Sequence, residues 1–445
     1  MDRREFIKTA GLGAAAIGVA ACAPKVLEDS SSEKSLPEGS MPQHYDGVGL
    51  LGYGCMRWPM VDGPDGKRHI DQEEVNRLVD VALEHGVNYF DTSPVYLEGD
   101  SERATAEALN RHPREKWLLA TKLSNFSDAT YENSVKMYRK SLEIFKTDHV
   151  DYYLLHAVSG GDDFAARFGD TGIMEFLLRE KALGHIRHLG LSFHGNQAGF
   201  DQLMALHDSG RYHWDFVQIQ MNYIDWTHAG GRNTNAEYLY AELDRREIPI
   251  VIMEPLRGGR LADMPAGTAD LLKAREPGKS LASWAFRFVG SYPRVQVVLS
   301  GMTYMEHLQD NLSSFLGFVP LTDEEKKFLY EDVADRLENY PLVRCTGCQY
   351  CMPCPYGINI PGIFKFYNDN VNAGTYVVSR EQKDYARARR KYLLAYDKAI
   401  PSVRQADHCI ACGKCVKACP QHIAIPRELR RIDSYIESLK QETIG

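Results

Sequence analysis

Residues 71–91 read DQEEVNRLVDVALEHGVNYFD and join one helix to one strand. The apolar side chains of the first part recur at helical spacing, at Val75, Leu78, Val79 and Ala82. Gly86 then marks the end of that helix. Residues 87–90 follow as a short strand-forming run that ends at Asp91. The stretch therefore predicts a helix followed directly by a strand.

The same alternation extends in both directions, from about residue 46 to residue 319. Seven further β-rich runs lie at 47–53, 117–121, 150–155, 186–192, 216–220, 248–253 and 295–300. Eight strand–helix units over roughly 250 residues are typical of an α/β fold, the (β/α)₈ TIM barrel. An open doubly wound sheet is the alternative, but no Gly-x-Gly-x-x-Gly follows an early strand. We expect the segments 158–172 and 225–236 to shape a substrate pocket.

The composition narrows the class of function. The chain has 445 residues, 44% of them hydrophobic, and a formal net charge of -8, so no basic surface favours nucleic acid as a partner. Eight of the ten cysteines lie within 345–419, and the others are Cys22 and Cys55. A disulfide framework would spread its cysteines through the fold, whereas metal or cluster ligation needs tight local spacing. Cys55 is expected to be a small packed residue.

The clustered cysteines form two runs, each followed by proline. The first comprises Cys345, Cys348, Cys351 and Cys354, and the second comprises Cys409, Cys412, Cys415 and Cys419. Three thiolates at this spacing can hold one face of a [4Fe–4S] cluster, with a fourth from a more distant cysteine. Tetrahedral zinc is the alternative, although zinc ribbons usually pair their cysteines two and two. Residues 354–361 and 419–426 also share the pattern C-P-x-x-I-x-I-P, which indicates two equivalent sites.

The second run has the bacterial ferredoxin spacing, and the whole segment over about residues 345–426 resembles the dicluster ferredoxins. That resemblance implies two [4Fe–4S] clusters, with the fourth cysteine of each run serving the other cluster. One cluster would then be held by Cys345, Cys348, Cys351 and Cys419, and the other by Cys409, Cys412, Cys415 and Cys354. The long insertion between the runs has a helical pattern, so the resemblance is to the more helical ferredoxins.

The chain between the barrel and the cysteines is expected to be a connecting helix over 320–344. Thr322 and Glu325 form a capping-box pattern that opens it, and it runs to about Leu337. Residues 345–445 then make a small, mainly helical iron–sulfur domain.

Residues 90–96 read FDTSPVY and are followed by Ser101-Glu102, which resembles the aldo/keto reductases. Lys122 ends the third predicted strand and His156 the fourth, in that family's order, and barrel active sites lie at such strand ends. The resemblance spans about 46–319. It implies that Asp91, Tyr96, Lys122 and His156 are catalytic.

Reducing a carbonyl group requires a hydride on carbon and a proton on oxygen. Tyr96 would act as the general acid/base, and a nearby Lys122 cation is expected to lower its pKa. Asp91 would hold the lysine charged and oriented, and His156 would orient the carbonyl oxygen.

The resemblance also implies a nicotinamide cofactor, NAD(P). Its expected contacts are Ser192, Gln218, Gly258, Gly259, Ser300, Gly301 and Asn311. Two positions depart from the family: Phe193 replaces the usual Asn, and Met253 replaces the ring-stacking Tyr. Because residues 300–311 contain no Lys or Arg for a 2′-phosphate, NAD is favoured over NADP.

The N-terminus is interpreted as a targeting signal. Arg3-Arg4, followed by the uncharged stretch from Thr9 to Pro24, resembles a twin-arginine signal over residues 1–25, which predicts export in the folded state to the periplasm. Residues 19–22 resemble a lipoprotein box that would acylate Cys22 and anchor the protein to the membrane. Residues 26–45 suit a flexible linker.

Together these features predict an exported oxidoreductase that acts on a small carbonyl or alcohol substrate, with electrons relayed by two clusters and exchanged with a redox partner protein. The alternative is a non-catalytic barrel that serves as a binding or scaffold subunit for an electron-transfer partner. The four catalytic residues favour the enzyme, whereas Phe193 and Met253 favour the scaffold.

Overall fold

The computed structural model describes residues 36, 39–45, 47–230 and 233–444. Its contacts divide the chain into Met1–Leu36 and Pro37–Gly445, and the second unit holds the barrel and the cysteine runs. The predicted signal over 1–25, with Cys22, and most of the linker over 26–45 lie outside the described residues. Among the helices of the described part, none has the length and apolar character needed to cross a membrane.

Eight parallel strands close into a barrel in the order β1-β10-β9-β8-β7-β6-β5-β4, with β1 paired to both β10 and β4. The (β/α)₈ prediction is therefore confirmed. The strands are β1 Leu51–Gly54, β4 Tyr89–Asp91, β5 Leu118–Leu123, β6 Val150–Val158, β7 Ile186–Phe193, β8 Val217–Gln220, β9 Ile250–Met253 and β10 Val295–Ser300.

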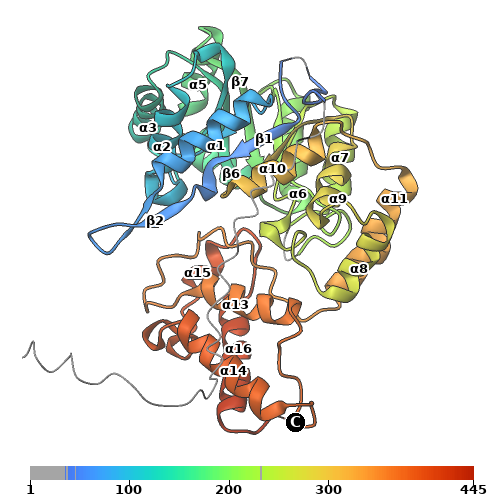
Figure 1. Cartoon of the computed structure of the whole chain (residues 1–445). Helices are drawn as coiled ribbons and strands as arrows, with labels where there is room; N and C mark the ends of the chain where they lie inside the picture. Colours follow the sequence, from blue (N-terminus) through green and yellow to red (C-terminus); the bar gives the residue numbers. More distant parts are fainter. Residues whose placement is uncertain (1–35, 37–38, 46, 231–232, 445) are drawn as a thin grey trace, which may run out of the picture. The chain divides into compact units, whose positions relative to one another are not determined.

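Helices follow the strands and surround the barrel (Figure 1). They are α1 Gln72–Glu84, α2 Ser101–Leu109, α3 Tyr131–Phe145, α4 Gly161–Phe164, α5 Ile173–Ala182, α6 Gln197–Asp208, α7 Ala236–Arg245, α8 Ala266–Arg275, α9 Leu281–Gly290 and α10 Met305–Phe315. The helix predicted within residues 71–91 is present as α1. It buries its apolar stripe, and Asp71 caps it by accepting a hydrogen bond from the Glu74 N–H.

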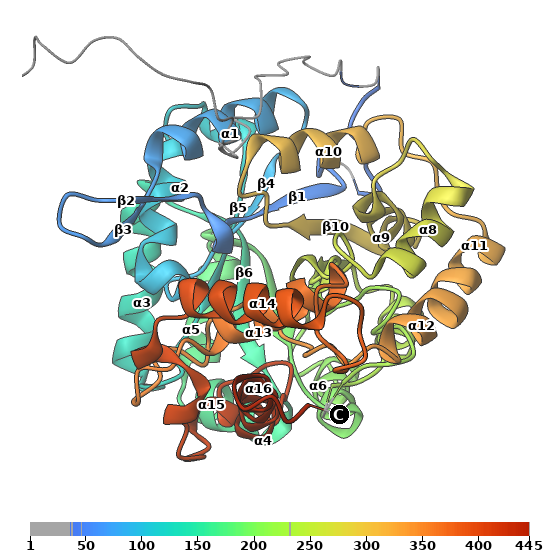
Figure 2. The same cartoon turned by 60° about the horizontal axis from the view of Figure 1, so that its bottom comes forward.

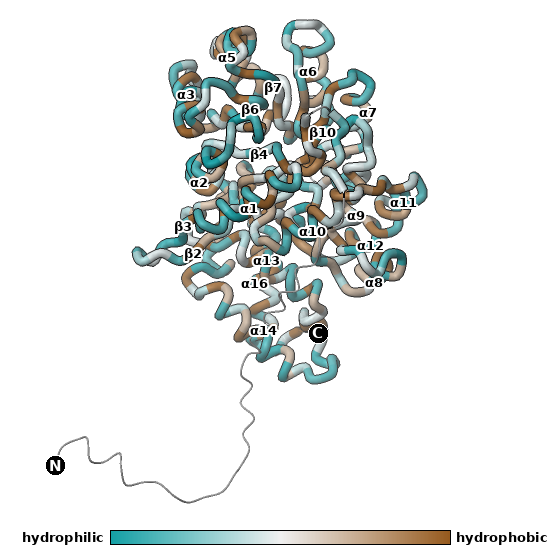
Figure 3. Tube along the Cα trace, turned by 45° about the horizontal axis from the view of Figure 1, so that its top comes forward, coloured by the Kyte–Doolittle hydropathy of each residue, from teal (hydrophilic) through white to brown (hydrophobic). Residues whose placement is uncertain are grey.

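One element was not expected from the sequence. A short antiparallel hairpin, β2 Met60–Asp62 and β3 Arg68–Ile70, follows β1 and is mostly exposed. The turn residues Gly63, Pro64 and Gly66 between the strands were the available signal. The apolar segments concentrate in the barrel interior around β10, whereas the hairpin turn is hydrophilic (Figure 3).

After the barrel the chain becomes helical. The predicted capping box at Thr322 and Glu325 is present and opens α11 Asp323–Phe328, which continues through a π-helical turn into α12 Ala334–Glu338. The insertion between the cysteine runs forms α13 Ile360–Asn372 and α14 Tyr385–Ala399. They are followed by α15 Lys414–Lys417 and α16 Ile425–Lys440 (Figure 2). These elements share a hydrophobic core of their own that includes Phe364, Tyr396 and Leu429.

The sequence repeat has a matching backbone. The two C-P-x-x-I-x-I-P copies lead into α13 and α16, and both helices carry proline in their first turn. Three equivalent positions also share a positive φ: Gly347 with Ala411 (67° and 57°), Gln349 with Gly413 (66° and 75°), and Gly357 with His422 (75° and 50°). The two cysteine loops therefore turn the backbone in the same way at these three positions, although Ala411, Gln349 and His422 lack the freedom of glycine. They differ elsewhere, because only the second run contains a helix, α15.

Packing between β7 and β8 depends on the close approach of the Phe216 backbone to Gly190 in β7. A Cβ added there would lie 2.4 Å from the Phe216 carbonyl oxygen, in backbone that cannot yield without disturbing β8. We predict that Gly190→Ala lowers the free energy of unfolding by about 1–3 kcal/mol, as overpacking does. Urea unfolding followed by circular dichroism measures the change.

Gly278 provides the matched control, because a Cβ there has nothing within 4 Å. Gly278→Ala should leave the free energy of unfolding unchanged, or raise it by up to about 1 kcal/mol through the unfolded state. Equal stability of the two variants would contradict this account of Gly190.

Candidate active site

Barrel closure brings the predicted catalytic side chains together at the carboxyl ends of three neighbouring strands. Asp91 ends β4, Lys122 is the fifth residue of β5 and His156 is in β6. Tyr96 follows β4 on a short 3₁₀ turn. All four are less than 9% exposed.

Asp91 and Lys122 form a buried ion pair. Lys122 Nζ lies 2.5 Å from Asp91 Oδ1 and also donates to the Thr92 carbonyl oxygen at 2.8 Å. Burial raises the pKa of Asp91 and lowers the pKa of Lys122, while the charge of each partner opposes that shift. Gln218 Nε2 donates to the second oxygen of Asp91 at 3.2 Å. The two buried charges are therefore stabilised by contacts between residues of three strands, β4, β5 and β8.

Tyr96 differs from the expectation in one respect. Lys122 Nζ lies 4.8 Å from the centroid of the Tyr96 ring, as a cation over its face. Burial raises the pKa of Tyr96 well above 10, and Tyr350 and Asp91 raise it further. The expectation that Lys122 lowers this pKa is wrong because desolvation dominates and the lysine charge is directed to Asp91. Tyr96 therefore keeps its proton at neutral pH.

His156 lies beside Tyr96, with ring centroids 5.7 Å apart in an edge-on arrangement. Its Nδ1 is 2.6 Å from Ser124 Oγ. Burial, and then the charge of Lys122, lowers the pKa of His156 well below 6.5, so the ring is neutral at neutral pH. Sequence reasoning missed Ser124, although its position two residues after Lys122 was an available signal.

The residues predicted to contact nicotinamide lie in or after the strands β7 to β10. Ser192 is in β7, Gln218 in β8, Gly258 and Gly259 on the turn after β9, Ser300 and Gly301 at and after the end of β10, and Asn311 in α10. Ser192 and Gln218 are register partners in β7 and β8. The Ser192 hydroxyl accepts a hydrogen bond from the Ala157 N–H at 2.7 Å, and Asn311 Nδ2 donates to Ser300 Oγ at 2.7 Å. Of the two departures from the family, Phe193 packs against Phe200 with ring centroids 5.0 Å apart, and Met253 ends β9.

The first cysteine loop, residues 345–351, also reaches the end of the barrel where these residues lie, which we call the barrel mouth. A Cβ built on Gly258 would lie 2.4 Å from Thr346 Cα, whereas Gly259 has open space. Arg57 donates to the Thr346 carbonyl oxygen, and its side chain lies against Gly301. Thr346 therefore covers Gly258, one of the residues predicted to contact nicotinamide, while Gly259 stays open.

Tyr350 is the most notable residue that sequence reasoning missed. It belongs to the first cysteine loop, yet its hydroxyl oxygen lies 3.3 Å from His156 Nε2. Nothing in the local sequence signals this contact, because 194 residues separate the partners.

Polar contacts hold the C-terminal segments to the barrel. Arg257, fully buried, pairs with Asp225 at 3.1 Å and with Glu338 at 3.2 Å. Gln421 Nε2 donates to Gln220 Oε1 at 2.8 Å, and Gln220 returns a bond of 3.2 Å.

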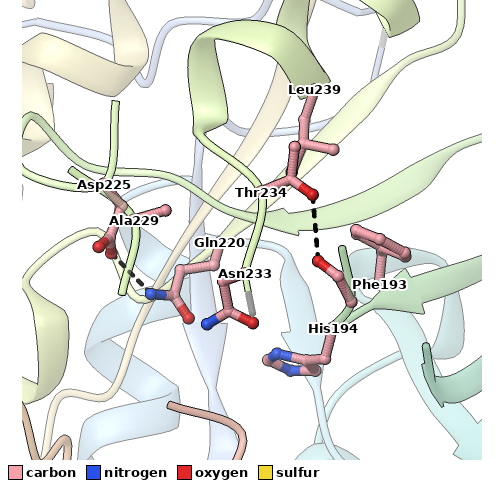
Figure 4. A pocket seen from close by; sticks show the side chains of 9 residues that line it. Phe193, His194, Gln220, Asp225, Ala229, Asn233, Thr234 and Leu239 are labelled. Carbon is pink, nitrogen blue, oxygen red and sulfur yellow. Dashed lines mark hydrogen bonds between the residues drawn. The ribbon is translucent and has the colours of Figure 1, made fainter. Parts of the chain in front are cut away.

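A small cavity lies beside this contact (Figure 4). Its lining includes Phe193, His194, Gln220 and residues of the 225–236 segment. Asn233, one of those lining residues, donates to the Pro420 carbonyl oxygen at 3.1 Å. Part of the segment expected to shape a pocket therefore borders this cavity.

The cysteines of the two runs separate into two groups. A cavity is lined by Cys345, Cys348, Cys351 and Cys419. Burial raises the pKa of Cys351 to about 12, and Cys348, Cys345 and Cys419 add to the rise. These four are the cysteines that the ferredoxin resemblance assigns to one cluster, and thiols around a cavity fit a cube of iron and sulfur.

The second group is more open. Burial raises the pKa of Cys415, and Cys409, Cys354 and Cys412 raise it further. Cys412 is exposed, whereas Cys419 of the first group is buried. Within the described residues, no three His, Cys, Asp or Glu side chains are arranged to hold a single metal ion. Cys55 is buried, as expected.

Comparison with known proteins agrees with this geometry. Residues 50–330 match the model of the aldo/keto reductase family, and residues 344–424 match that of the 4Fe-4S dicluster domain. The uncharacterized oxidoreductase YqkF of Bacillus subtilis is 25% identical over 63% of this chain and 92% of its own. L-galactose dehydrogenase of Arabidopsis thaliana is 22% identical over 66% of this chain and 92% of its own.

A solved structure has the same barrel fold. It is the aldo/keto reductase from Klebsiella pneumoniae in complex with NADP and acetate. Its TM-score is 0.50 at 22% identity, over 64% of this chain and 92% of that one.

The buried ion pair generates a stability prediction. Lys122→Met leaves the Asp91 carboxylate without its counter-charge, so the free energy of unfolding should fall by about 3–5 kcal/mol. The double variant Asp91→Asn, Lys122→Met removes both charges and should lose less. Urea unfolding of the two variants measures the difference. A double variant as unstable as Lys122→Met would show that the charges are not what matters.

Proposed function

Because the chain belongs to the aldo/keto reductase family, we propose that it is an oxidoreductase that interconverts a small carbonyl compound and its alcohol, with Tyr96 as the proton-transferring group. The observation that carries the proposal is the convergence of Asp91, Tyr96, Lys122 and His156 at one end of the barrel. Single residues of these types are common, but this buried arrangement at the strand ends is where barrel chemistry occurs.

The arrangement suits proton donation to oxygen. Tyr96 retains its proton at neutral pH because burial raises its pKa, so its hydroxyl can donate to a substrate carbonyl oxygen. The neutral His156 ring, oriented through Ser124, adds a second group that can hydrogen-bond to that oxygen. The Lys122 cation, fixed by Asp91, lies close enough to stabilise negative charge that develops as the proton moves.

We further propose that the C-terminal segment holds two [4Fe–4S] clusters. Cys345, Cys348, Cys351 and Cys419 would hold one, and Cys409, Cys412, Cys415 and Cys354 the other; the cavity and the grouping of the thiols support this assignment. When bound, such clusters supply one-electron transfer, and a redox partner protein would exchange those electrons. Nicotinamide, which would supply the hydride to the carbonyl carbon when bound, stays a prediction from sequence, with NAD favoured over NADP.

Export is also part of the proposal. The twin-arginine pattern over residues 1–25 suits a protein that acquires its clusters before translocation, since that route moves folded chains. The protein would then be periplasmic, and acylated Cys22 would tether it through the 26–45 linker.

The alternative, a non-catalytic scaffold, is favoured by Phe193, Met253 and the closure of the barrel mouth by the first cysteine loop. Substitution of Tyr96 separates the two functions, because a scaffold does not need its hydroxyl.

Tyr96→Phe removes the proton donor while keeping the ring. We predict that turnover falls about 100- to 10,000-fold, the usual contribution of a general acid. The assay follows anaerobic oxidation of reduced methyl viologen in the presence of a panel of aldehydes and ketones. Tyr340→Phe, at a surface position, is the control and should retain full turnover. Equal rates for the two variants would favour the scaffold.

The cysteine grouping predicts iron content. Cys419→Ala should lower the iron from about eight to about four atoms per chain, because one cluster is lost. Adding Cys348→Ala should cost no more iron, since both belong to the same group, whereas adding Cys412→Ala should remove the rest. Iron analysis and low-temperature electron paramagnetic resonance measure these losses. Cys55→Ala is the control, and the opposite result for the two double variants would refute the grouping.

A further inference from the structure

The first cysteine loop, residues 345–351, faces two sites at once. On one side Cys345, Thr346, Cys348, Gln349 and Cys351 line the first cysteine cavity. On the other side Tyr350 reaches the catalytic residues of the barrel. The loop is therefore the partition between the two sites.

Tyr350 is hydrogen-bonded to both groups that would hold a substrate oxygen. Its hydroxyl lies 3.3 Å from His156 Nε2. The Tyr350 hydroxyl also interacts with Tyr96 and raises its pKa, and in this phenol pair either hydroxyl can be the donor. A carbonyl oxygen bound for reduction would accept a hydrogen bond from the Tyr96 hydroxyl at the same place.

Contacts away from Tyr350 hold the loop in this position. Thr346 packs against Gly258 and accepts a hydrogen bond from Arg57. Arg344, just before the loop, pairs with Glu338, which also binds the buried Arg257. The approach of Tyr350 to the catalytic residues is thus supported by the barrel and does not depend on its hydroxyl alone.

We propose that Tyr350 is an internal ligand of the catalytic site. Its phenol oxygen takes the place of the substrate oxygen between Tyr96 and His156, so Tyr350 and substrate exclude each other. Because Cys348 and Cys351 flank Tyr350, occupation of the catalytic site is coupled to the cluster that these cysteines hold. The inference rests on the proposed function, since it takes Tyr96 and His156 as the groups that bind the substrate oxygen.

This arrangement affects two measurable quantities: the affinity of the catalytic site for a ligand, and the coupling between that site and the cluster. A ligand that must displace Tyr350 binds more weakly than it would to a site without that competitor. Coupling between two sites is reciprocal and commonly changes an affinity by about 5- to 150-fold. A ligand at Tyr96 and His156 should therefore alter the signal of the cluster beside Cys348, and removal of the Tyr350 hydroxyl should tighten binding of that ligand.

The experiment uses the complete cluster-loaded chain under anaerobic conditions, with sodium acetate as the probe, because a carboxylate oxygen accepts the hydrogen bonds that a carbonyl would. Acetate affinity is measured by calorimetry, and the reduced clusters are observed by electron paramagnetic resonance with and without acetate. Tyr350→Phe removes the hydroxyl and keeps the ring. Tyr356→Phe, at an exposed position beside Cys354, is the matched control.

We expect Tyr350→Phe to bind acetate about 5- to 150-fold more tightly than the unmodified chain, and Tyr356→Phe to bind it equally. Acetate should shift the resonance of the cluster lost in Cys348→Ala, and the shift should shrink in Tyr350→Phe. Unchanged acetate affinity in Tyr350→Phe would overturn the inference, as would a resonance that does not respond to acetate in the unmodified chain.

Failure of the inference can be told from failure of the proposed function. If Tyr96→Phe and His156→Ala abolish acetate binding while Tyr350→Phe leaves it unchanged, the catalytic site stands and Tyr350 is not its internal ligand. If Tyr96→Phe and His156→Ala bind acetate as the unmodified chain does and turnover does not respond to Tyr96, the proposed function itself is wrong.

Discussion

Closure of the eight-stranded sheet is the constraint on which the remaining features depend. Because β1 pairs with both β4 and β10, every strand has two neighbours and all carboxyl ends lie on one ring. That ring fixes Asp91 and Lys122 close enough to form a buried pair, and the pair in turn positions a cation over Tyr96. A one-residue slip between β4 and β5 would turn Lys122 to the other face of the sheet and leave Asp91 buried without its counter-charge.

The sequence predicted those features that depend on local pattern. The eight strands, α1 with its capped start, the capping box at Thr322 and the helical insertion between the cysteine runs all follow from spacing and end signals, and all are present. The hairpin after β1 was missed because its strands are only three residues long and mostly exposed, so they carry little hydrophobic pattern.

Features that depend on tertiary packing were less predictable. The direction of the pKa shift at Tyr96 depends on how completely the ring is buried, which no local pattern reveals. The contacts of Tyr350 and Thr346 with the barrel join residues far apart in the chain, and these two residues have ordinary neighbours in sequence. The residues expected to hold nicotinamide lie in or after β7 to β10, but the segment that covers Gly258 comes from another part of the chain.

The two cysteine loops share a sequence pattern and three backbone turns, but their side chains have different surroundings. Counted from the first cysteine of each run, Tyr350 and Lys414 occupy the same place, between the second and third cysteines. Lys414 is exposed, whereas Tyr350 lies against His156. The first loop thus turns the residue at this place towards the barrel, and the second turns it to solvent. Only the first of the two related loops is therefore constrained by the barrel's chemistry, whereas a substitution at the same place in the second loop meets solvent.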